Sequence, residues 1–249
     1  MVFKLPRMFS VCVGPHSLTH AGSRAKAHLI TLNTFMKNTL LRALNRITEL
    51  CPVMNENHGA AFVSFMGYVA TFAEMSSLHL QGDERFFVLP NAQGKKLVDF
   101  LGTACNPNVG YLQSKLKDVE KKSREWRKAP TCYNSQDMLS ILSFSDELVE
   151  IMSKQLDCIQ NGKIEKEIDD EILGAMVQEN VHWIGKTSDI AILLPFILSH
   201  HDSNSNSCLN WPTISPEGRA ELPQIVNVHA DIWKFAPFHP ITKEAQSLS

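Results

Sequence analysis

The sequence predicts an all-α fold, because apolar side chains recur at helical spacing and strand patterns are nearly absent. From Ala25 to Leu50 the apolar residues lie three or four positions apart, and the Cys51-Pro52 step ends this helix because proline lacks a backbone donor. The only compact strand candidate, Phe86 to Leu89, is better explained as the end of a helix. With 249 residues the chain can bury a large core, so we expect one helical domain over residues 1–249.

Further helices are expected along most of the chain. They run from near Asn57 to just before Pro90, from about Asn108 to Arg127, from Ser135 to Ile159, from Glu165 to Ile184, and from near Ser188 to about His200. Together with the first helix they form a predicted core bundle over about residues 25–202. The remainder, about residues 203–249, has polar and proline-broken stretches but also contains Trp211, Trp233, Phe235 and Phe238. That is too much aromatic surface for a disordered end, so we expect this extension to pack over the bundle.

Charge and composition exclude several classes of function. The 24 basic and 26 acidic residues give a net charge of −2, without a basic stripe, so nucleic acid is not an expected partner. No segment has the length and apolarity of a membrane span, and the N-terminus lacks the apolar run of a signal peptide, so we expect a cytoplasmic protein without a membrane partner. The 6 cysteines lack the paired spacing of a zinc ribbon and are expected to be reduced thiols. The oligomeric state is left open.

The helix from Phe65 to Pro90 carries the strongest functional signal. One stripe of it faces the interior and combines apolar residues with a histidine and a carboxylate; its members are Tyr68, Phe72, Met75, His79, Asp83 and Phe86. A charged group on such a stripe is costly unless it is paired, hydrogen-bonded or bound to a metal. His79 and Asp83 are one turn apart and can contact the same ion. On spacing alone, a core histidine paired with Asp83 is favoured over a pair of metal ligands.

Three further histidines and one glutamate are candidate functional groups. His200 and His201 follow an apolar helix, and because adjacent side chains diverge by about 100°, at most one of them faces the interior. Their alternative is a helix C-terminus at which imidazolium complements the helix dipole. His229 lies in an aromatic-rich segment, where structural packing is the ordinary alternative. Glu74 lies five residues before His79, which places the two side chains about 140° apart around the helix, so they cannot share one ion. The alternative to a functional role for Glu74 is a solvated or salt-bridged carboxylate.

At these residues the sequence resembles fungal hemerythrin-like proteins. The motif F-x-G-Y-x(5)-E-x(4)-H-x(3)-D-E-x-x-F, which begins at Phe65 and is followed closely by proline, is similar to the metal-bearing helix of that family. Two more segments agree in order: RALNRI at 42–47, and PFILSHHD at 195–202 with NVHADIWKFAP at 227–237. The resemblance implies a hemerythrin-like helical bundle with additional helices, on which the aromatic-rich C-terminal extension packs.

The metal ligands expected from the resemblance are mostly missing. Hemerythrin-like proteins hold a di-iron centre with about five histidines and two carboxylates from four helices. Here the first-helix histidine is replaced near Lys37, His79 is all that remains of a histidine-rich run, and the third and fourth predicted helices contain no histidine. Oxygen carriage is therefore not expected. What remains suits one divalent metal, zinc in preference to iron, held by His79, Asp83 and His201.

Within this family the chain as a whole is most similar to the cyclopenases of quinolone-alkaloid biosynthesis, although no single motif carries that likeness. The resemblance implies an enzyme of fungal secondary metabolism, a metal-dependent lyase whose partner is a small apolar aromatic alkaloid. It would convert a cyclopenin-type benzodiazepinedione epoxide into a viridicatin-type quinolone. The ring contraction expels methyl isocyanate, which ends as carbon dioxide and methylamine.

The candidate residues can be given roles in such a reaction, in which a metal acts as a Lewis acid and nearby side chains move protons beside an apolar wall. The residues assigned are His79, Asp83 and His201 for the metal, His229, His200 and Glu74 for catalysis, and Phe72, Met75 and Trp233 for the wall. The alternative function is a non-catalytic hemerythrin-like protein that has lost its di-iron site and binds a ligand or a partner. An iron–oxygen redox protein ranks last, because its ligand shell is depleted.

Overall fold

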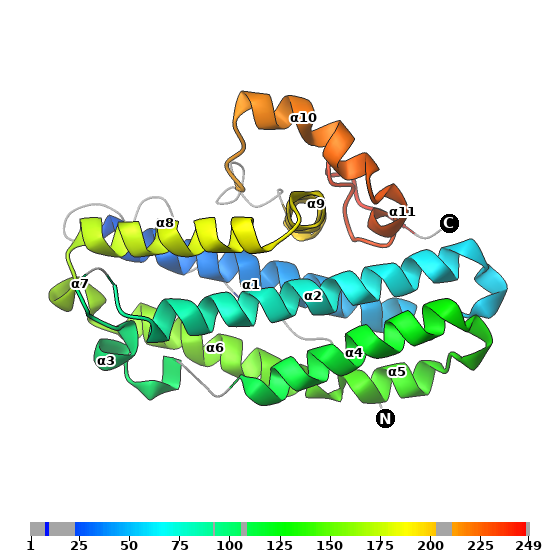
Figure 1. Ribbon diagram of the computed structural model, residues 1–249, viewed down its shortest axis with the longest axis horizontal. Helices are drawn as coiled ribbons and strands as arrows, with labels where there is room; N and C mark the ends of the chain where they lie inside the picture. Colours follow the sequence, from blue (N-terminus) through cyan, green and yellow to red (C-terminus); the bar gives the residue numbers. More distant parts are fainter. Residues whose placement is uncertain (1–7, 10–22, 92, 106–108, 203–210, 248–249) are drawn as a thin grey trace.

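The computed structural model describes residues 8–9, 23–91, 93–105, 109–202 and 211–247. The described residues form helices, turns and connecting segments, and an isolated bridge between Phe238 and Ala245 is the only β contact among them. The prediction of an all-α fold is confirmed. The longest helices lie side by side as a bundle (Figure 1); they are α1 (Arg24–Leu50), α2 (Ala60–Val88), α4 (Gly110–Lys128), α6 (Ser145–Asn161) and α8 (Asp170–Thr187).

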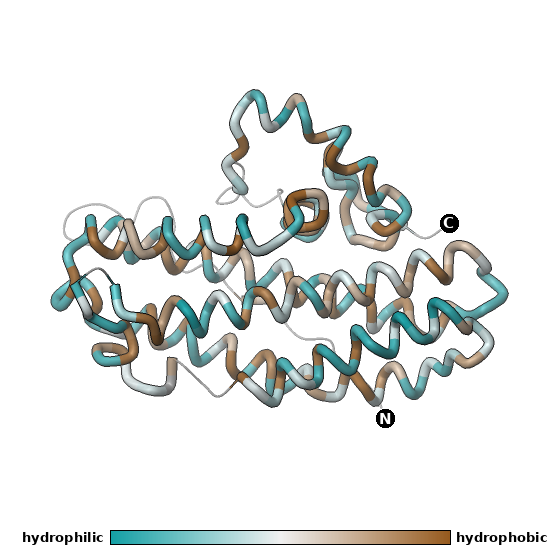
Figure 2. The backbone as a smooth tube through the Cα atoms, in the orientation of Figure 1, coloured by the Kyte–Doolittle hydropathy of each residue, from teal (hydrophilic) through white to brown (hydrophobic). Residues whose placement is uncertain are grey.

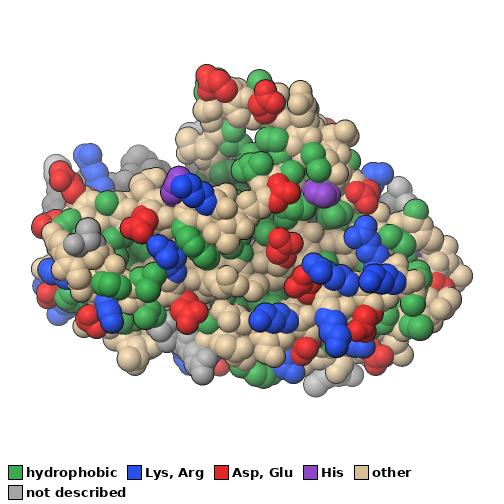
Figure 3. Space-filling view, in the orientation of Figure 1, with side chains coloured by type: hydrophobic (Ala, Val, Ile, Leu, Met, Phe, Trp, Pro, Cys, Tyr) green, Lys and Arg blue, Asp and Glu red, His purple; other side chains and the backbone are tan. Residues whose placement is uncertain are grey.

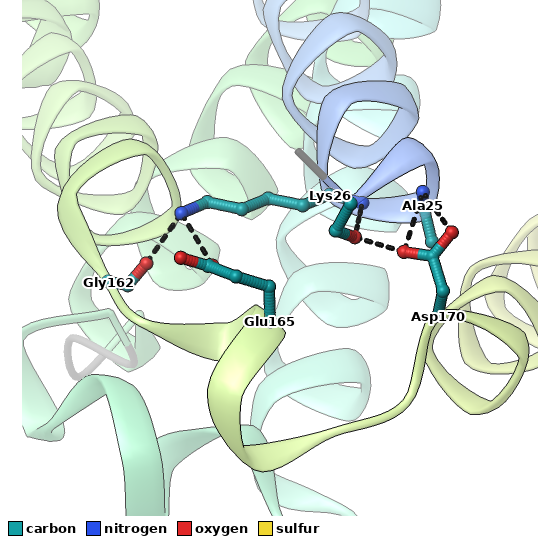
Figure 4. A network of polar contacts seen from close by, with 6 residues as sticks. Ala25, Lys26, Gly162, Glu165 and Asp170 are labelled. Carbon is teal, nitrogen blue, oxygen red and sulfur yellow. Dashed lines mark hydrogen bonds and ion pairs between the residues drawn. The ribbon is translucent and has the colours of Figure 1, made fainter. Parts of the chain in front are cut away.

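Helix α1 begins in a network of polar contacts at the surface (Figure 4). The Asp170 carboxylate accepts a hydrogen bond from the Ala25 backbone N–H at 3.2 Å and contacts the Ser23 hydroxyl. A negative charge at this place complements the dipole of α1. The Lys26 ammonium forms an ion pair with Glu165 at 2.9 Å. These contacts tie the first turn of α1 to the start of α8 and to the turn before it.

Helix α2 begins at Ala60, slightly later than predicted, because a capping box closes the turn before it. The Asn55 side chain accepts hydrogen bonds from the backbone of the 3₁₀ turn Glu56–His58, and the His58 side chain accepts one from the Asn55 backbone. Gly59 then takes a φ of 53°, a left-handed conformation that favours glycine. The helix ends at Val88, before Pro90, as predicted.

The predicted helix Ser135–Ile159 is wrong as a single element. The structure divides it into α5 (Ser135–Ile141) and α6, with a 3₁₀ turn at Leu142–Phe144 between them. Leu142 and Phe144 are both buried. Side chains two positions apart diverge by about 200° on a straight α-helix, so the break lets both of them reach the core.

The predicted helix Glu165–Ile184 is also divided. It consists of α7 (Ile164–Glu167) and α8, because Ile168 takes an extended backbone conformation and is itself buried. A further short helix, α3 (Leu97–Leu101), and a 3₁₀ turn at Thr103–Cys105 were not predicted. These elements are too short to produce a periodic pattern in the sequence.

Helix α9 (Ile190–His200) agrees with the prediction and turns away from α8 by 117°. It is one of the most hydrophobic stretches of the chain (Figure 2). The described part of the extension forms α10 (Pro216–Asn227) and α11 (Ala230–Trp233), which arch over α9 (Figure 1). Phe235 is buried with its ring centroid 5.5 Å from that of Phe65 on α2, so this part packs on the bundle as predicted.

Two clusters of apolar side chains fill the bundle, a large one that extends from Leu40 to Ala236 and a smaller one around Leu29, Phe87 and Ile159. Taken singly, none of the described helices is long and apolar enough to cross a membrane, although α8 and α9 pass that test together as a bent pair. Free thiols in the described part of the chain are Cys51, Cys105, Cys132 and Cys158. Cys12 and Cys208 lie outside the described residues.

Candidate functional site

The interior stripe predicted on α2 is buried along its length. The relative exposures of its six side chains run from 0% to 7%; they are Tyr68, Phe72, Met75, His79, Asp83 and Phe86. Helical spacing therefore located a histidine and a carboxylate inside the protein correctly. Buried polar groups of this kind need partners, and the partners come mainly from α1.

Lys37 of α1 brings a positive charge to the point that His79 and Asp83 both face. Its Nζ donates a hydrogen bond to Asp83 Oδ2 at 2.8 Å and lies 3.1 Å from His79 Nε2. A third hydrogen bond joins Nζ to Asn33 Oδ1 at 3.2 Å, one turn earlier on α1. The Lys37 side chain has an exposure of 0% and that of Asp83 has 6%, so the ion pair is almost without solvent contact. We call Asn33, Lys37, His79 and Asp83 the lysine cluster.

Protonation in the lysine cluster follows from burial and from the lysine. Burial lowers the pKa of His79 to about 4, with Lys37 acting in the same direction and Asp83 opposing it. His79 is therefore neutral near pH 7, and because its Nε2 accepts from the ammonium, its Nδ1 carries the proton. Burial alone would raise the pKa of Asp83, but His79, then Lys37 and the side chain of Gln155 on α6, hold it below its usual value. The carboxylate is charged.

The lysine cluster as arranged does not fit a bound metal ion. Its two donor atoms, His79 Nε2 and Asp83 Oδ2, lie 3.4 Å apart, and the Lys37 ammonium occupies the position between them. A metal ion there would have a positive charge as its nearest neighbour. Among the described residues no three histidines, cysteines or carboxylates are grouped so that they could hold a metal. The predicted third ligand, His201, lies in a different environment.

A pocket of about 350 Å³ opens beside the lysine cluster, and His79, Asp83 and Asn33 form part of its lining. Its other walls come from α1, α8, α9 and the segment that leads to α10. Apolar side chains supply most of these walls; they are Leu32, Met36, Val181, Ile184, Leu193, Ile197, Trp211 and Pro212. Figure 3 shows hydrophobic side chains gathered below α10 on this side of the molecule. The pocket thus combines apolar walls with a buried polar end.

The side chains predicted as a substrate wall do not line this pocket. Phe72, Met75 and Trp233 are buried in the main core cluster instead. The correction has a simple cause, because the stripe of α2 is covered over most of its length by neighbouring helices and by the extension. Of its six side chains, His79 and Asp83 are the two that line this pocket. The apolar walls come instead from α1, α8, α9 and the segment that leads to α10, whose relative positions the sequence does not reveal.

His200 is sealed in the core and has both ring nitrogens engaged. Its Nδ1 lies 2.7 Å from the Phe196 carbonyl oxygen, so it must donate there, and Nε2 accepts from the Tyr68 hydroxyl at 2.6 Å. Burial lowers the pKa of His200 to about 3, which keeps the ring neutral. His200 does not line the pocket, and the structure does not bring it to the lysine cluster.

The other predicted groups are also separate from the lysine cluster. His201 is buried between aromatic rings, 4.9 Å from Phe35 and 4.6 Å from Trp211 between centroids. His229 is half-buried at the start of α11 and Glu74 is exposed on α2. The pKa of Glu74 is raised, first by loss of hydration against the neighbouring helices and then by the negative charge of Glu120. Neither His229 nor Glu74 lines the pocket.

The sequence contained a signal for the partners of His79 and Asp83 that the sequence analysis did not identify. Asn33 and Lys37 are one turn apart on a face of α1 that is otherwise apolar, between Leu29 and Leu40, as His79 and Asp83 are on α2. Two polar pairs on the buried faces of adjacent helices suggest that the polar residues of one helix contact those of the other. Gln155 carries no comparable signal, because glutamine is common on exposed helix faces.

Comparisons of the chain with protein-family models, with curated proteins and with solved structures found no match. What the site can do follows from its own side chains. It presents a neutral imidazole that can donate through Nδ1 and a carboxylate that can accept, at the end of an apolar pocket. The buried ammonium behind them balances the charge of the carboxylate.

Proposed function

We propose that the pocket binds a small, largely apolar molecule and directs its polar group at His79 and Asp83. In this proposal the chain is a hemerythrin-like protein that has lost its di-iron site and kept a ligand-binding role. The observation that carries it is the pocket itself, which has about 350 Å³ of space, mostly apolar walls and a buried polar end at His79 and Asp83. Small-molecule sites commonly have this size and this composition.

The charges of the lysine cluster support an uncharged ligand. Lys37 and Asp83 neutralise each other within the protein, at 2.8 Å and almost without solvent contact. A charged ligand would lose its hydration at the base of the pocket without gaining an opposite charge there. An uncharged molecule loses less, and its polar group can still bond to His79 and Asp83.

The binding proposal is tested with the uncharged fluorescent probe N-phenyl-1-naphthylamine and two matched variants on α9. Leu193 lines the pocket, whereas Ile190 is 52% exposed and does not. We expect Leu193→Trp to fill the pocket and weaken probe binding by about tenfold or more, which corresponds to about 1.4 kcal/mol. Ile190→Trp should leave the dissociation constant unchanged. Equal effects of the two variants, or absence of binding to the wild type, would contradict the proposal.

The second candidate function is the lyase implied by the resemblance, and the position of His79 and Asp83 at the end of an apolar pocket favours it. These groups could exchange a proton with a flat molecule held against the apolar wall. The direct test is to incubate the protein with cyclopenin and to look for the quinolone product by mass. Product from wild type that His79→Gln fails to form supports the lyase, whereas absence of product leaves ligand binding as the function.

The predicted cofactor, one divalent metal with zinc preferred over iron, stays a prediction. The lyase assay is therefore run on protein treated with a chelator and on protein supplied with zinc. Activity that requires zinc supports the metal-dependent reaction of the resemblance. Equal activity in both samples assigns the chemistry to the side chains of the pocket.

A further inference from the structure

We infer that Lys37 is a built-in cation that replaces a metal ion between His79 and Asp83, so that this site excludes divalent metals for as long as the lysine is present. The inference does not depend on the proposed function, because it concerns what occupies the polar end of the pocket and not what enters the pocket. It also predicts a metal site that appears when the lysine is removed.

The donor atoms retain the spacing of metal ligands. His79 Nε2 and Asp83 Oδ2 are 3.4 Å apart. Zinc binds nitrogen and carboxylate oxygen at about 2.1 Å, and two such bonds to atoms at this separation enclose an angle of about 108°, close to the tetrahedral value. One turn of α2 therefore holds a histidine and a carboxylate in a geometry that a tetrahedral ion could use without rearrangement.

The lysine ammonium takes the place of that ion. Nζ lies 2.8 Å from the carboxylate oxygen and 3.1 Å from the imidazole nitrogen, the two atoms that would bind the metal. Asn33 Oδ1, at 3.2 Å, holds the ammonium from a third side. The Lys37 side chain has an exposure of 0%, so the ammonium is enclosed at this position.

Electrostatics make the two cations mutually exclusive. A buried carboxylate is stabilised by one adjacent positive charge, and at separations of 3–4 Å in a partly dry interior a second cation is strongly repelled by the first. A divalent ion would also lack ligands, since no third histidine, cysteine or carboxylate joins the pair among the described residues. Replacing Lys37 by histidine removes the competing charge and supplies a third donor from the same position on α1.

The test measures metal content and cobalt(II) absorption in the folded protein. Wild type and Lys37→His are incubated with zinc chloride, dialysed and submitted to elemental analysis; in parallel both are titrated with cobalt(II). We expect the wild type to retain no stoichiometric metal, and Lys37→His to retain about one equivalent and to give the visible band of tetrahedral cobalt(II). Zinc should raise the Tm of Lys37→His and not that of the wild type.

Two controls place the metal and identify the cause. Lys37→Arg keeps a positive charge at the site and should remain free of metal. His79→Ala added to Lys37→His should abolish metal retention, which locates the ion at this histidine. Stoichiometric zinc in the wild type that His79→Ala removes would overturn the inference, and so would a helical Lys37→His that retains none. If Lys37→His does not fold, the wild-type measurement decides by itself.

Discussion

Helix α2 meets two buried histidines in the same core, and they differ in what surrounds them. His79 lies on α2 itself, beside the Lys37–Asp83 ion pair and at the edge of the pocket. His200, from α9, stacks on Tyr68 of α2 and does not line that pocket. Both side chains are at most 5% exposed, and burial lowers the pKa of both. Burial alone therefore does not distinguish the two histidines, whereas a charged partner and an adjacent pocket do.

The largest effect expected of a substitution comes from breaking the ion pair at the pocket end. Asp83→Leu leaves the Lys37 ammonium enclosed without its carboxylate, which should lower the free energy of unfolding by about 3–5 kcal/mol. Lys37→Met combined with Asp83→Leu removes both charges and should recover most of that loss. Urea denaturation of the wild type, both single variants and the double variant gives the coupling energy. A double variant no more stable than Asp83→Leu would show that the two charges are not coupled.

Acid should destabilise the protein through both histidines. Their folded-state pKa values, about 4 for His79 and about 3 for His200, lie below the ordinary value of 6.5. As the pH falls below about 6.5, the two histidines bind protons in the unfolded chain but not in the folded protein. Their contribution to the free energy of unfolding is therefore complete above pH 6.5 and declines towards pH 4. Linkage gives a loss of about 3 kcal/mol at pH 4 for each histidine.

The acid prediction is measured by urea denaturation between pH 8 and pH 4. Asp83 cannot cause a loss in this range, because its pKa is lowered from 3.8 and its contribution disappears only under more acidic conditions. In His200→Gln about half of the decline in stability should be absent, which separates the contribution of His200 from that of His79. A wild-type stability that is flat between pH 6.5 and pH 4 would contradict neutral burial of both rings.

A smaller effect is expected from breaking the buried hydrogen bond between Tyr68 and His200. Tyr68→Phe removes the hydroxyl that donates to His200 Nε2 and leaves a buried acceptor without a partner, which should cost about 1–3 kcal/mol. Probe binding should be unchanged, because neither residue lines the pocket. His79→Gln should instead weaken probe binding. If Tyr68→Phe weakens binding as much as His79→Gln does, the two regions are not functionally distinct.

The sequence predicted the elements that depend on local pattern. The spacing of apolar residues on α2 placed His79 and Asp83 on its buried face, because a helix exposes each face at a fixed period. The same pattern continues through Leu142 and Ile168, so it could not reveal the breaks between α5 and α6 and between α7 and α8. Those breaks are set by tertiary packing, which overrides local preference.

The candidate site was predictable only in part. Lys37 contacts His79 and Asp83 because of the way α1 lies along α2. The pattern of residues within either helix does not determine this relative position. The pocket depends on the 117° bend between α8 and α9 and on where the segment carrying Trp211 crosses them. Among the predicted residues on later elements, His200 ends a helix as expected. The expectation that at most one of His200 and His201 faces the interior is wrong, because both are buried, and no helix was predicted beside His229.

The smallest expected effect concerns an exposed ion pair whose N–O distance is nearly that of the Lys37–Asp83 pair. Lys26–Glu165 joins α1 to the turn before α8 at 2.9 Å, nearly the 2.8 Å of Lys37–Asp83, but its side chains are 16% and 34% exposed instead of 0% and 6% (Figure 4). Glu165→Gln and Asp83→Asn make the same chemical change, from a carboxylate to an amide. We expect Glu165→Gln to cost less than about 1 kcal/mol and to cost less still in high salt, because water and ions screen the exposed pair. Asp83→Asn should cost several times more and should respond little to salt, so equal losses in urea denaturation would mean that burial is not what distinguishes the lysine cluster.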